Sequence, residues 1–184
     1  MIVALFGVIC VGKTTIGRII SERLGFKFFD LDAEIKSFYD DTLTNIYSDC
    51  ICRNAIDKKK AVVLKNVLNR CGEKAIIAIS PIYYTMEYKH MFIHRGVLSI
   101  VLQDTPENIA DRMVDTDDND IIIENRESDR KEDIKDIKYF ISRYKSAYRK
   151  IPCHYHINGK SASEAADDII NKILKPAIQL DSDL

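Results

Sequence analysis

The residues best suited to catalysis lie near the start of the chain, in a segment bracketed by two glycines. Residues 7–14 read Gly-Val-Ile-Cys-Val-Gly-Lys-Thr, which fits the pattern G-x-x-x-x-G-K-[ST] at every position. The glycines let the backbone turn with its N–H groups inward, where they and the N-terminus of the following helix hold phosphate oxygens. In such a loop Lys13 contacts the β- and γ-phosphates, and the hydroxyl of Thr14 binds Mg²⁺. The segment therefore predicts a triphosphate site formed by Gly7, Cys10, Val11, Gly12, Lys13, Thr14 and Thr15.

A pair of carboxylates follows the next apolar run. Asp30 and Asp32 come directly after Phe26–Phe29, and in an extended chain residues two positions apart face the same side. They would lie at the carboxyl end of a strand, where open α/β sheets bind their ligands. One carboxylate would complete the magnesium shell, and the other would accept a hydrogen bond from an attacking hydroxyl.

A sheet must position these groups, and the pattern of apolar residues predicts one. Five short, continuous apolar runs are typical of strands buried on both faces: Ile2–Phe6, Phe26–Phe29, Ala75–Ile79, Val97–Leu102 and His154–Ile157. Helical patterns fall between or after them, at Thr14–Leu24, Asn54–Cys71, from Thr105, at Ile134–Arg149, and from Ser161 to Pro176. The alternation predicts an α/β fold, a five-stranded parallel sheet flanked by helices on both faces.

One segment interrupts this alternation. Residues 115–136 hold ten acidic and four basic residues with few apolar ones, and indicate a surface excursion that we expect to act as a lid. The chain has no internal repeat and no low-complexity linker. We therefore expect one domain over residues 1–184.

Composition excludes several other classes of function. The chain has 184 residues, a net charge of -1, 46% hydrophobic and 30% charged residues. We therefore expect no nucleic acid partner and no membrane partner, since there is neither a basic field nor an apolar stretch long enough to span a bilayer. No basic residue precedes the first apolar run, and the five cysteines are scattered. We expect a cytoplasmic protein, a monomer, with a small-molecule substrate.

The opening of the chain resembles shikimate kinases, which are small-metabolite kinases built on the P-loop kinase fold. The resemblance is carried by Gly-Lys-Thr-Thr-Ile-Gly-Arg at residues 12–18 and by Leu-Gly-Phe-Lys-Phe-Phe-Asp-Leu-Asp-Ala-Glu-Ile at residues 24–35. It implies ATP and Mg²⁺ as cofactors. It also implies that Asp30 supports Mg²⁺, and that Asp32 binds the substrate hydroxyls and assists deprotonation.

Later segments extend the resemblance over nearly the whole chain. Residues 106–112 read Pro-Glu-Asn-Ile-Ala-Asp-Arg and are similar to the helix whose arginine stacks on adenine, which implies that role for Arg112. Arg143 is similar to the arginine of the late helix that pairs with the substrate carboxylate. Residues 158–163 lie where the family has its adenine-side loop.

The acceptor side departs from the family pattern at two positions. Residues 80–84 read Ser-Pro-Ile-Tyr-Tyr, where the family has a Gly-Gly-Gly turn, so Ser80 would face the substrate. Residues 56–60 read Ile-Asp-Lys-Lys-Lys near the place of the family's Phe-Arg pair, where Lys60 or Arg53 would substitute for the arginine.

The lid also departs from the family. The family's Arg-Pro-Leu-Leu segment, whose arginine reaches the transferring phosphate, is absent. Arg126 or Arg130 in the acidic excursion would take that catalytic role.

Together these features predict an ATP-dependent phosphotransferase that acts on a hydroxyl of a small metabolite, with shikimate as the first candidate. Lys13 and Asp32 would be the main catalytic residues, and Ser80, Lys60 and Arg143 would contact the substrate. Two alternatives remain: a kinase for another acceptor, such as a nucleotide or sugar acid, and a nucleotide-binding regulator without transfer activity.

Overall fold

A five-stranded parallel sheet forms the centre of the molecule in the computed structural model, which describes residues 1–83, 86–113 and 129–182. The strands are β1 (Ile2–Phe6), β2 (Lys27–Asp30), β3 (Ala75–Ala78), β4 (Val97–Gln103) and β5 (Cys153–His156). They lie in the order β2-β3-β1-β4-β5, and each neighbouring pair is parallel. The strand prediction and the α/β fold are confirmed.

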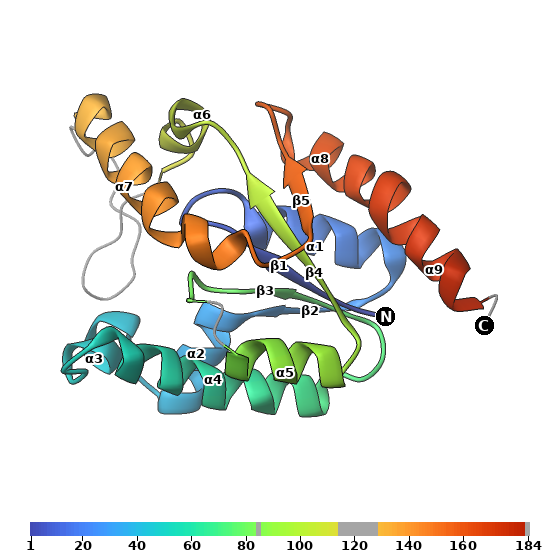
Figure 1. Ribbon diagram of the computed structural model, residues 1–184, viewed down its shortest axis with the longest axis horizontal. Helices are drawn as coiled ribbons and strands as arrows, with labels where there is room; N and C mark the ends of the chain where they lie inside the picture. Colours follow the sequence, from blue (N-terminus) through green and yellow to red (C-terminus); the bar gives the residue numbers. More distant parts are fainter. Residues whose placement is uncertain (84–85, 114–128, 183–184) are drawn as a thin grey trace.

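Helices cover both faces of the sheet (Figure 1). They are α1 (Lys13–Leu24), α2 (Leu31–Tyr39), α3 (Leu43–Ser48), α4 (Arg53–Arg70), α5 (Met86–His94), α6 (Pro106–Ala110), α7 (Arg130–Tyr148), α8 (Ala162–Ile169), the π-helical turn η1 (Ile170–Leu174) and α9 (Lys175–Ser182). The helix α1 packs against α8, whereas α2 packs against α4 and α5 contacts β4. In Figure 1, α6 and α7 lie together beyond the carboxyl end of β4.

The first strand and helix set the position of the glycine-bracketed loop. All five residues of β1 are buried, as expected of a central strand. A Cβ atom on Gly17 would lie 2.7 Å from the ring of Phe28, so glycine permits the close approach of α1 to the sheet. Gly25 ends α1 in the left-handed conformation, with φ 65°. Residues 7–12 are thus held between a buried strand and a tightly packed helix.

The ends of the strands bring the polar residues together. Leu5 of β1, Ala78 of β3 and Asp30 of β2 share one level of the hydrogen-bonding register. The loops that leave these strands therefore emerge side by side at the carboxyl edge, where ligands bind in open α/β sheets.

Two predictions about helices need correction. Pro176 does not end the last helix, because η1 links α8 directly to α9. A proline ring clashes with the carbonyl four residues earlier in a regular α-helix, and the wider π turn relieves that clash. In addition, α7 begins at Arg130, so residues 130–136 of the predicted excursion are its first turns, with Asp129 as the N-cap. Residues 114–128 lie outside the described part of the chain.

No helix in the described residues is long and apolar enough to span a bilayer.

Candidate active site

The loop between β1 and α1 has the backbone geometry of a phosphate cradle. Gly7 and Gly12 have φ angles of 147° and 103°, and Cys10 adopts the left-handed conformation with φ 55°. These angles turn successive N–H groups toward one side of the loop. At Gly7 a Cβ atom would lie 2.7 Å from the carbonyl oxygen of Leu102, so no other residue fits that position without moving β4.

The side chain of Lys13 folds back over this loop. Its Nζ donates hydrogen bonds to the carbonyl oxygens of Gly7, at 3.1 Å, and Val8, at 2.7 Å. Burial lowers the pKa of Lys13 to about 8, although the nearby carboxylates of Asp32 and Asp30 oppose the shift. The ammonium is therefore poorly solvated, and an anion such as a phosphate would compensate its charge.

Asp30 joins the loop to the second strand. Its Oδ2 accepts a hydrogen bond of 2.5 Å from the hydroxyl of Thr14, and its Oδ1 accepts one of 3.0 Å from the N–H of Asp32. Asp30 is thus the N-cap of α2, and Asp32 lies in the first turn of that helix. The prediction of two carboxylates on one face of an extended segment was wrong, because the helix begins between them. Both nevertheless line the same cavity.

Ser80 positions the carboxylate of Asp32. The segment after β3 carries Ser80, whose hydroxyl donates a 2.5 Å hydrogen bond to Oδ1 of Asp32. Only 2% of Ser80 is exposed. A hydrogen bond to a charged group contributes about 1.5–3 kcal/mol, so the orientation of the carboxylate is strongly restrained. The structure therefore brings Asp32 and Ser80 together through a direct hydrogen bond.

Two cavities meet at the N-terminus of α1. The first, of about 170 Å³, is lined by Ile9, Cys10, Lys13, Thr14, Asp30, Asp32, Ala78, Ile79, Ser80 and Pro81. The second, of about 630 Å³, is lined by Cys10, Gly12, Lys13, Thr14, Thr15, Asp111, Arg112 and Met113. We call them the acceptor cavity and the nucleotide cavity. They share Cys10, Lys13 and Thr14, so a group bound at these residues would be accessible from both sides.

A buried lysine lies at the edge of the acceptor cavity. Lys60 of α4 is only 7% exposed, and its Nζ donates a hydrogen bond of 3.0 Å to the carbonyl oxygen of Pro81. Burial lowers the pKa of Lys60, while the carboxylates of Asp32 and Asp57 act in the opposite direction. Arg53, the alternative in the sequence, is exposed at the start of α4. The structure therefore favours Lys60 as the cation beside Asp32.

Sequence reasoning did not identify Tyr47 of α3. The Nζ atom of Lys60 lies 5.3 Å from the centre of its ring, and its buried hydroxyl has no hydrogen-bond partner among the described residues. Burial, together with the negative charge of Asp32, raises the pKa of Tyr47. An unpaired buried hydroxyl is costly unless a ligand completes its hydrogen bond. No motif marks this residue, because α3 was not predicted.

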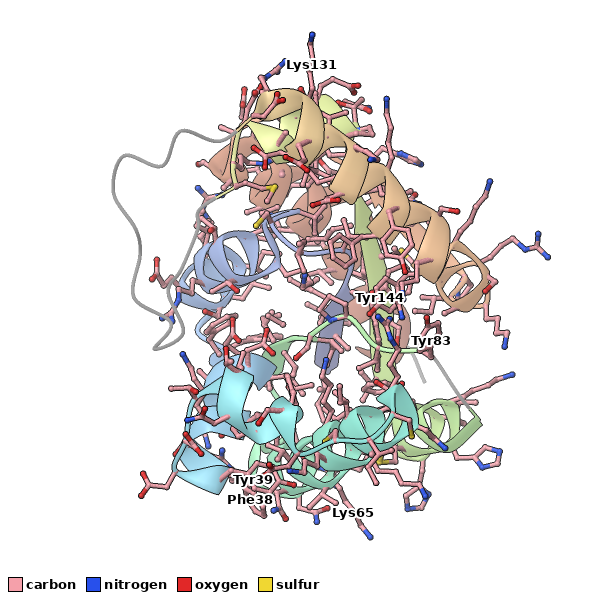
Figure 2. The ribbon with its side chains drawn as sticks, turned by 90° about the vertical axis from the view of Figure 1, so that its left-hand side faces the viewer. Phe38, Tyr39, Lys65, Tyr83, Lys131 and Tyr144 are labelled. Atoms are coloured by element: carbon pink, nitrogen blue, oxygen red, sulfur yellow. The ribbon has the colours of Figure 1, made fainter. Side chains whose placement is uncertain are left out.

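Arg143 of α7 lies among tyrosine side chains. Its Nε donates a 2.9 Å hydrogen bond to the hydroxyl of Tyr83, and its Nη1 donates one of 2.8 Å to the hydroxyl of Tyr139. Tyr83 follows Pro81 of the acceptor cavity, and its ring centre lies 5.3 Å from that of Tyr144 (Figure 2). Arg143 is therefore connected to the acceptor side, but two of its donor groups already have partners.

Arg112 lines the nucleotide cavity and is held by a buried acid. Its Nη2 forms a 2.6 Å ion pair with Asp104, while its Nε is buried without a partner among the described residues. Burial alone would raise the pKa of Asp104, but hydrogen bonds from Asn108, Arg112 and the N–H of Thr105 lower it. The N–H of Gly159 also donates to Asp104, at 3.3 Å. One carboxylate thus links Arg112 to the loop after β5.

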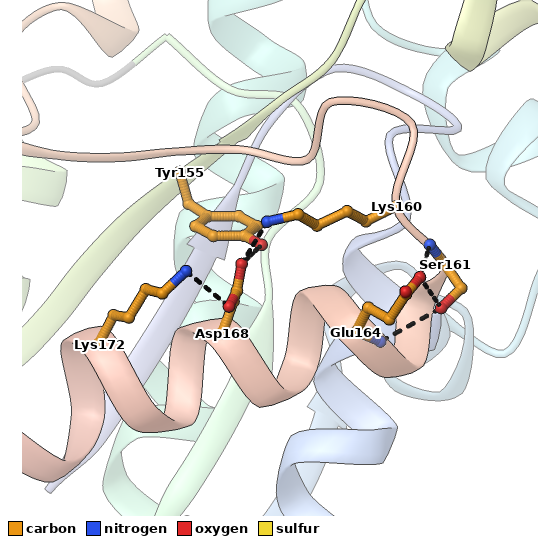
Figure 3. A network of polar contacts seen from close by, with 6 residues as sticks. All are labelled: Tyr155, Lys160, Ser161, Glu164, Asp168 and Lys172. Carbon is orange, nitrogen blue, oxygen red and sulfur yellow. Dashed lines mark hydrogen bonds and ion pairs between the residues drawn. The ribbon is translucent and has the colours of Figure 1, made fainter.

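A second network fixes the other end of that loop (Figure 3). Lys160 donates to Asp168 of α8, and the hydroxyl of Tyr155 donates to the same carboxylate at 3.0 Å. The hydrogen bond from Lys160 is the main reason why the pKa of Asp168 is lowered. Ser161 and Glu164 form a capping box at the start of α8, as predicted. Residues 158–163 are therefore held against the nucleotide side.

The two arginines predicted for the lid are not found among the described residues that line the cavities. Arg130 donates two hydrogen bonds, of 3.0 Å and 2.7 Å, to Asp111, which lines the nucleotide cavity. Arg130 itself is not among the residues that line either cavity. The prediction for Arg126 falls outside the described residues.

Comparison with known proteins identifies a family. The model of the family described as shikimate kinase matches residues 9–174. A shikimate kinase of Bacillus licheniformis is 26% identical over 171 residues, which cover 93% of this chain and 92% of that protein. A shikimate kinase of Persephonella marina is 23% identical over 170 residues, which cover 92% of this chain and 96% of that protein.

Solved structures of the same description share the fold. Shikimate kinase from Acinetobacter baumannii, solved in complex with shikimate, has a TM-score of 0.76 at 21% identity. The match covers 95% of this chain and 93% of the chain of that structure. Shikimate kinase from Aquifex aeolicus has a TM-score of 0.71 at 19% identity, with coverages of 96% and 98%. At these identities the structures support the fold alone.

Proposed function

This chain belongs to the shikimate kinase family of ATP-dependent small-molecule kinases, and we propose that it phosphorylates a hydroxyl of shikimate. The observation that carries the proposal is the junction of the two cavities. A carboxylate oriented by Ser80 faces one cavity, the glycine-bracketed loop faces the other, and Lys13 and Thr14 belong to both. A phosphoryl group held at this junction would lie within reach of an acceptor hydroxyl.

The residues of the loop fit a magnesium-bound triphosphate. Thr14 Oγ1 and Asp30 Oδ2 lie 2.5 Å apart, and such hard oxygen donors suit Mg²⁺. When bound, the metal would neutralise charge on the β- and γ-phosphates. The N–H groups of residues 7–12 would hold the phosphate oxygens, and Lys13 would exchange its bonds to Gly7 and Val8 for bonds to phosphate.

Asp32 would orient the acceptor and receive its proton. Phosphoryl transfer requires positioning and charge neutralisation more than covalent chemistry by the protein. The carboxylate of Asp32 would accept a hydrogen bond from the attacking hydroxyl, while Ser80 keeps that carboxylate turned into the cavity. Lys13 would stabilise the negative charge that shifts from the γ-phosphate to the leaving ADP.

The carboxylate of the acceptor would bind at Lys60 rather than at a family-type arginine. An ammonium has three donors, and within the described part of the chain Lys60 donates one hydrogen bond, to the carbonyl oxygen of Pro81, which leaves donors for a ligand. The unpaired hydroxyl of Tyr47 lies beside it and would supply a further hydrogen bond. Arg143, whose donors already contact Tyr83 and Tyr139, would make a smaller contribution to acceptor binding.

The outer parts of the nucleotide would bind along Arg112 and the loop of residues 158–163. We propose that Arg112 stacks on adenine. We also propose that residues 115–136 act as the lid, with Arg126 or Arg130 as the lid arginine. We also propose one kinase domain over residues 1–184, a monomeric state and a cytoplasmic location.

A coupled assay of ADP release tests the proposal. We expect turnover that depends on both ATP and shikimate, and much weaker turnover with gluconate or a nucleoside monophosphate. Activity with one of those acceptors in place of shikimate would support the second candidate, a kinase for a different acceptor, which the substitution of Ser-Pro for glycines at residues 80–81 favours. ATP binding without turnover on any acceptor would contradict both.

A further inference from the structure

A third cavity lies apart from the active site, between α7 and the carboxyl ends of β4 and β5. Its volume is about 340 Å³, within the range of small-molecule sites. It shares no lining residue with the acceptor cavity or the nucleotide cavity. We call it the α7 groove.

The floor of the α7 groove is apolar. Val101 and Leu102 of β4 and Ile109 of α6 line it and are at most 1% exposed, and Ile141 of α7 adds a half-buried side chain. Tyr148 lines it as well. Such a floor suits the face of a ring rather than a bare inorganic anion, because it offers dispersion contacts and no hydrogen bonds.

The rim of the groove is cationic. Lys145 and Arg149 stand four residues apart at the end of α7 and therefore project from the same side of the helix. Neither side chain has a hydrogen-bond or ion-pair partner within the described part of the chain. By contrast, Arg112, Arg130 and Arg143 each donate to a described partner.

The carboxylate in the lining does not cancel these charges. Asp104 already accepts hydrogen bonds from Arg112, Asn108 and two backbone N–H groups. Its charge is therefore balanced on the nucleotide side. The imidazole of His154 is likewise engaged, by Ile151 and Gln103, whereas His156 at the end of β5 has no such partner among the described residues. The groove is thus an apolar slot with uncompensated positive charge at its rim.

From this arrangement we propose that the α7 groove is a second binding site, for a small carboxylate that carries a planar ring. The ring would lie on the floor formed by β4 and α6, and the carboxylate would be bound by Arg149 in a two-pronged hydrogen bond, with Lys145 beside it. The hydroxyl of Tyr148 donates to the carbonyl oxygen of Gly7 at 3.2 Å, and Val8 also lines the groove. An occupant would therefore contact the back of the phosphate loop.

Isothermal titration of the full chain with trans-cinnamate tests the proposal, and its readout does not require turnover. We expect saturable binding of cinnamate and none of the neutral isostere cinnamamide. Because a charge-assisted bidentate bond is lost, Arg149→Gln should weaken binding about tenfold or more. Lys150→Gln, at the next position and outside the lining, should leave binding unchanged. ATP titration of each variant would verify that the fold is intact.

One further variant separates the groove from the acceptor cavity, which also has a cation. Lys60→Met should leave cinnamate binding unchanged. Loss of binding in Lys60→Met with retention in Arg149→Gln would place cinnamate in the acceptor cavity and overturn the proposal. Absence of any cinnamate binding, or equal binding of cinnamamide, would overturn it as well.

Discussion

The two halves of the active site lie at the same edge of the sheet but are built in different ways. The nucleotide half is mainly backbone, a loop of unusual φ angles fixed between β1 and α1, with Lys13 folded over it. The acceptor half is made of side chains from separate elements, namely Asp32, Ser80, Lys60 and Tyr47. A backbone cradle tolerates little change, whereas side chains can be exchanged one at a time. The difference accounts for an acceptor half that departs from the family while the phosphate loop keeps its pattern.

Replacing Lys13 should affect both halves, because this residue lines both cavities. We expect Lys13→Ala to lower kcat/KM about 10³-fold, since charge stabilisation in the transition state is lost. Steady-state ADP release measures the effect. Lys27→Ala, an exposed control on β2, should retain full activity. Retention of more than a tenth of the wild-type activity in Lys13→Ala would contradict the assigned role.

Replacing Asp32 should separate the halves. Asp32→Asn keeps the shape of the side chain but removes the proton acceptor, so we expect kcat to fall about 10²-fold or more while the Kd of ATP changes less than about twofold. Rapid-quench kinetics and ATP titration would measure the two quantities. A parallel loss of ATP binding would mean that this carboxylate supports the nucleotide, the role proposed for Asp30.

Replacing Lys60 should affect acceptor binding alone. We expect Lys60→Met to raise the KM for shikimate about tenfold to 100-fold, because a charge-assisted contact to the acceptor carboxylate is lost. The KM for ATP should remain unchanged. Lys58→Met, an exposed neighbour on α4, is the matched control. An unchanged KM for shikimate would transfer the anion-binding role to Arg143.

Removing the hydroxyl of Ser80 should have a smaller effect on the chemical step. Ser80→Ala leaves Asp32 without its 2.5 Å hydrogen bond, and we expect kcat to fall about tenfold. Ser80→Thr keeps the hydroxyl and should recover most of the loss, as measured by kcat at saturating substrates. Equal activity of the alanine and threonine variants would argue against a positioning role.

The pH dependence of ATP binding should give the smallest effect. The pKa of Lys13 is lowered to about 8, so its charge is complete below that value and is lost as the pH rises through it. We expect the association constant for ATP to fall about threefold between pH 7.5 and 8.5, because binding then requires uptake of a proton. Calorimetry in buffers of different ionisation enthalpy would detect that proton. A flat profile would indicate an ordinary lysine pKa.

The sequence predicted the sheet and the phosphate loop because both depend on local signals. Continuous apolar runs mark buried strands, and the spacing of Gly7, Gly12 and Lys13 determines a backbone path. The prediction for Asp30 and Asp32 was less complete. Asp30 is the N-cap of α2, and the sequence analysis did not predict that helix.

Contacts between distant segments could not be derived from spacing. Tyr47 is brought to Lys60 by the packing of α3, and Asp104 binds both Arg112 and Gly159 across 55 residues of sequence. Pro176 led to a wrong prediction of a helix end, because a π-helical turn before it allows the helix to continue. For Tyr47 and Asp104 the deciding contact lies far away in the sequence, whereas for Pro176 it is the conformation of the preceding turn.

The most direct test of the central claim, transfer of a phosphoryl group from a backbone cradle to a hydroxyl held by Asp32, is a ³¹P NMR time course with ATP, Mg²⁺ and shikimate. The account predicts a new phosphate monoester signal that grows as ADP forms and requires shikimate. Unchanged ATP, or inorganic phosphate as the sole product beside ADP, would contradict it.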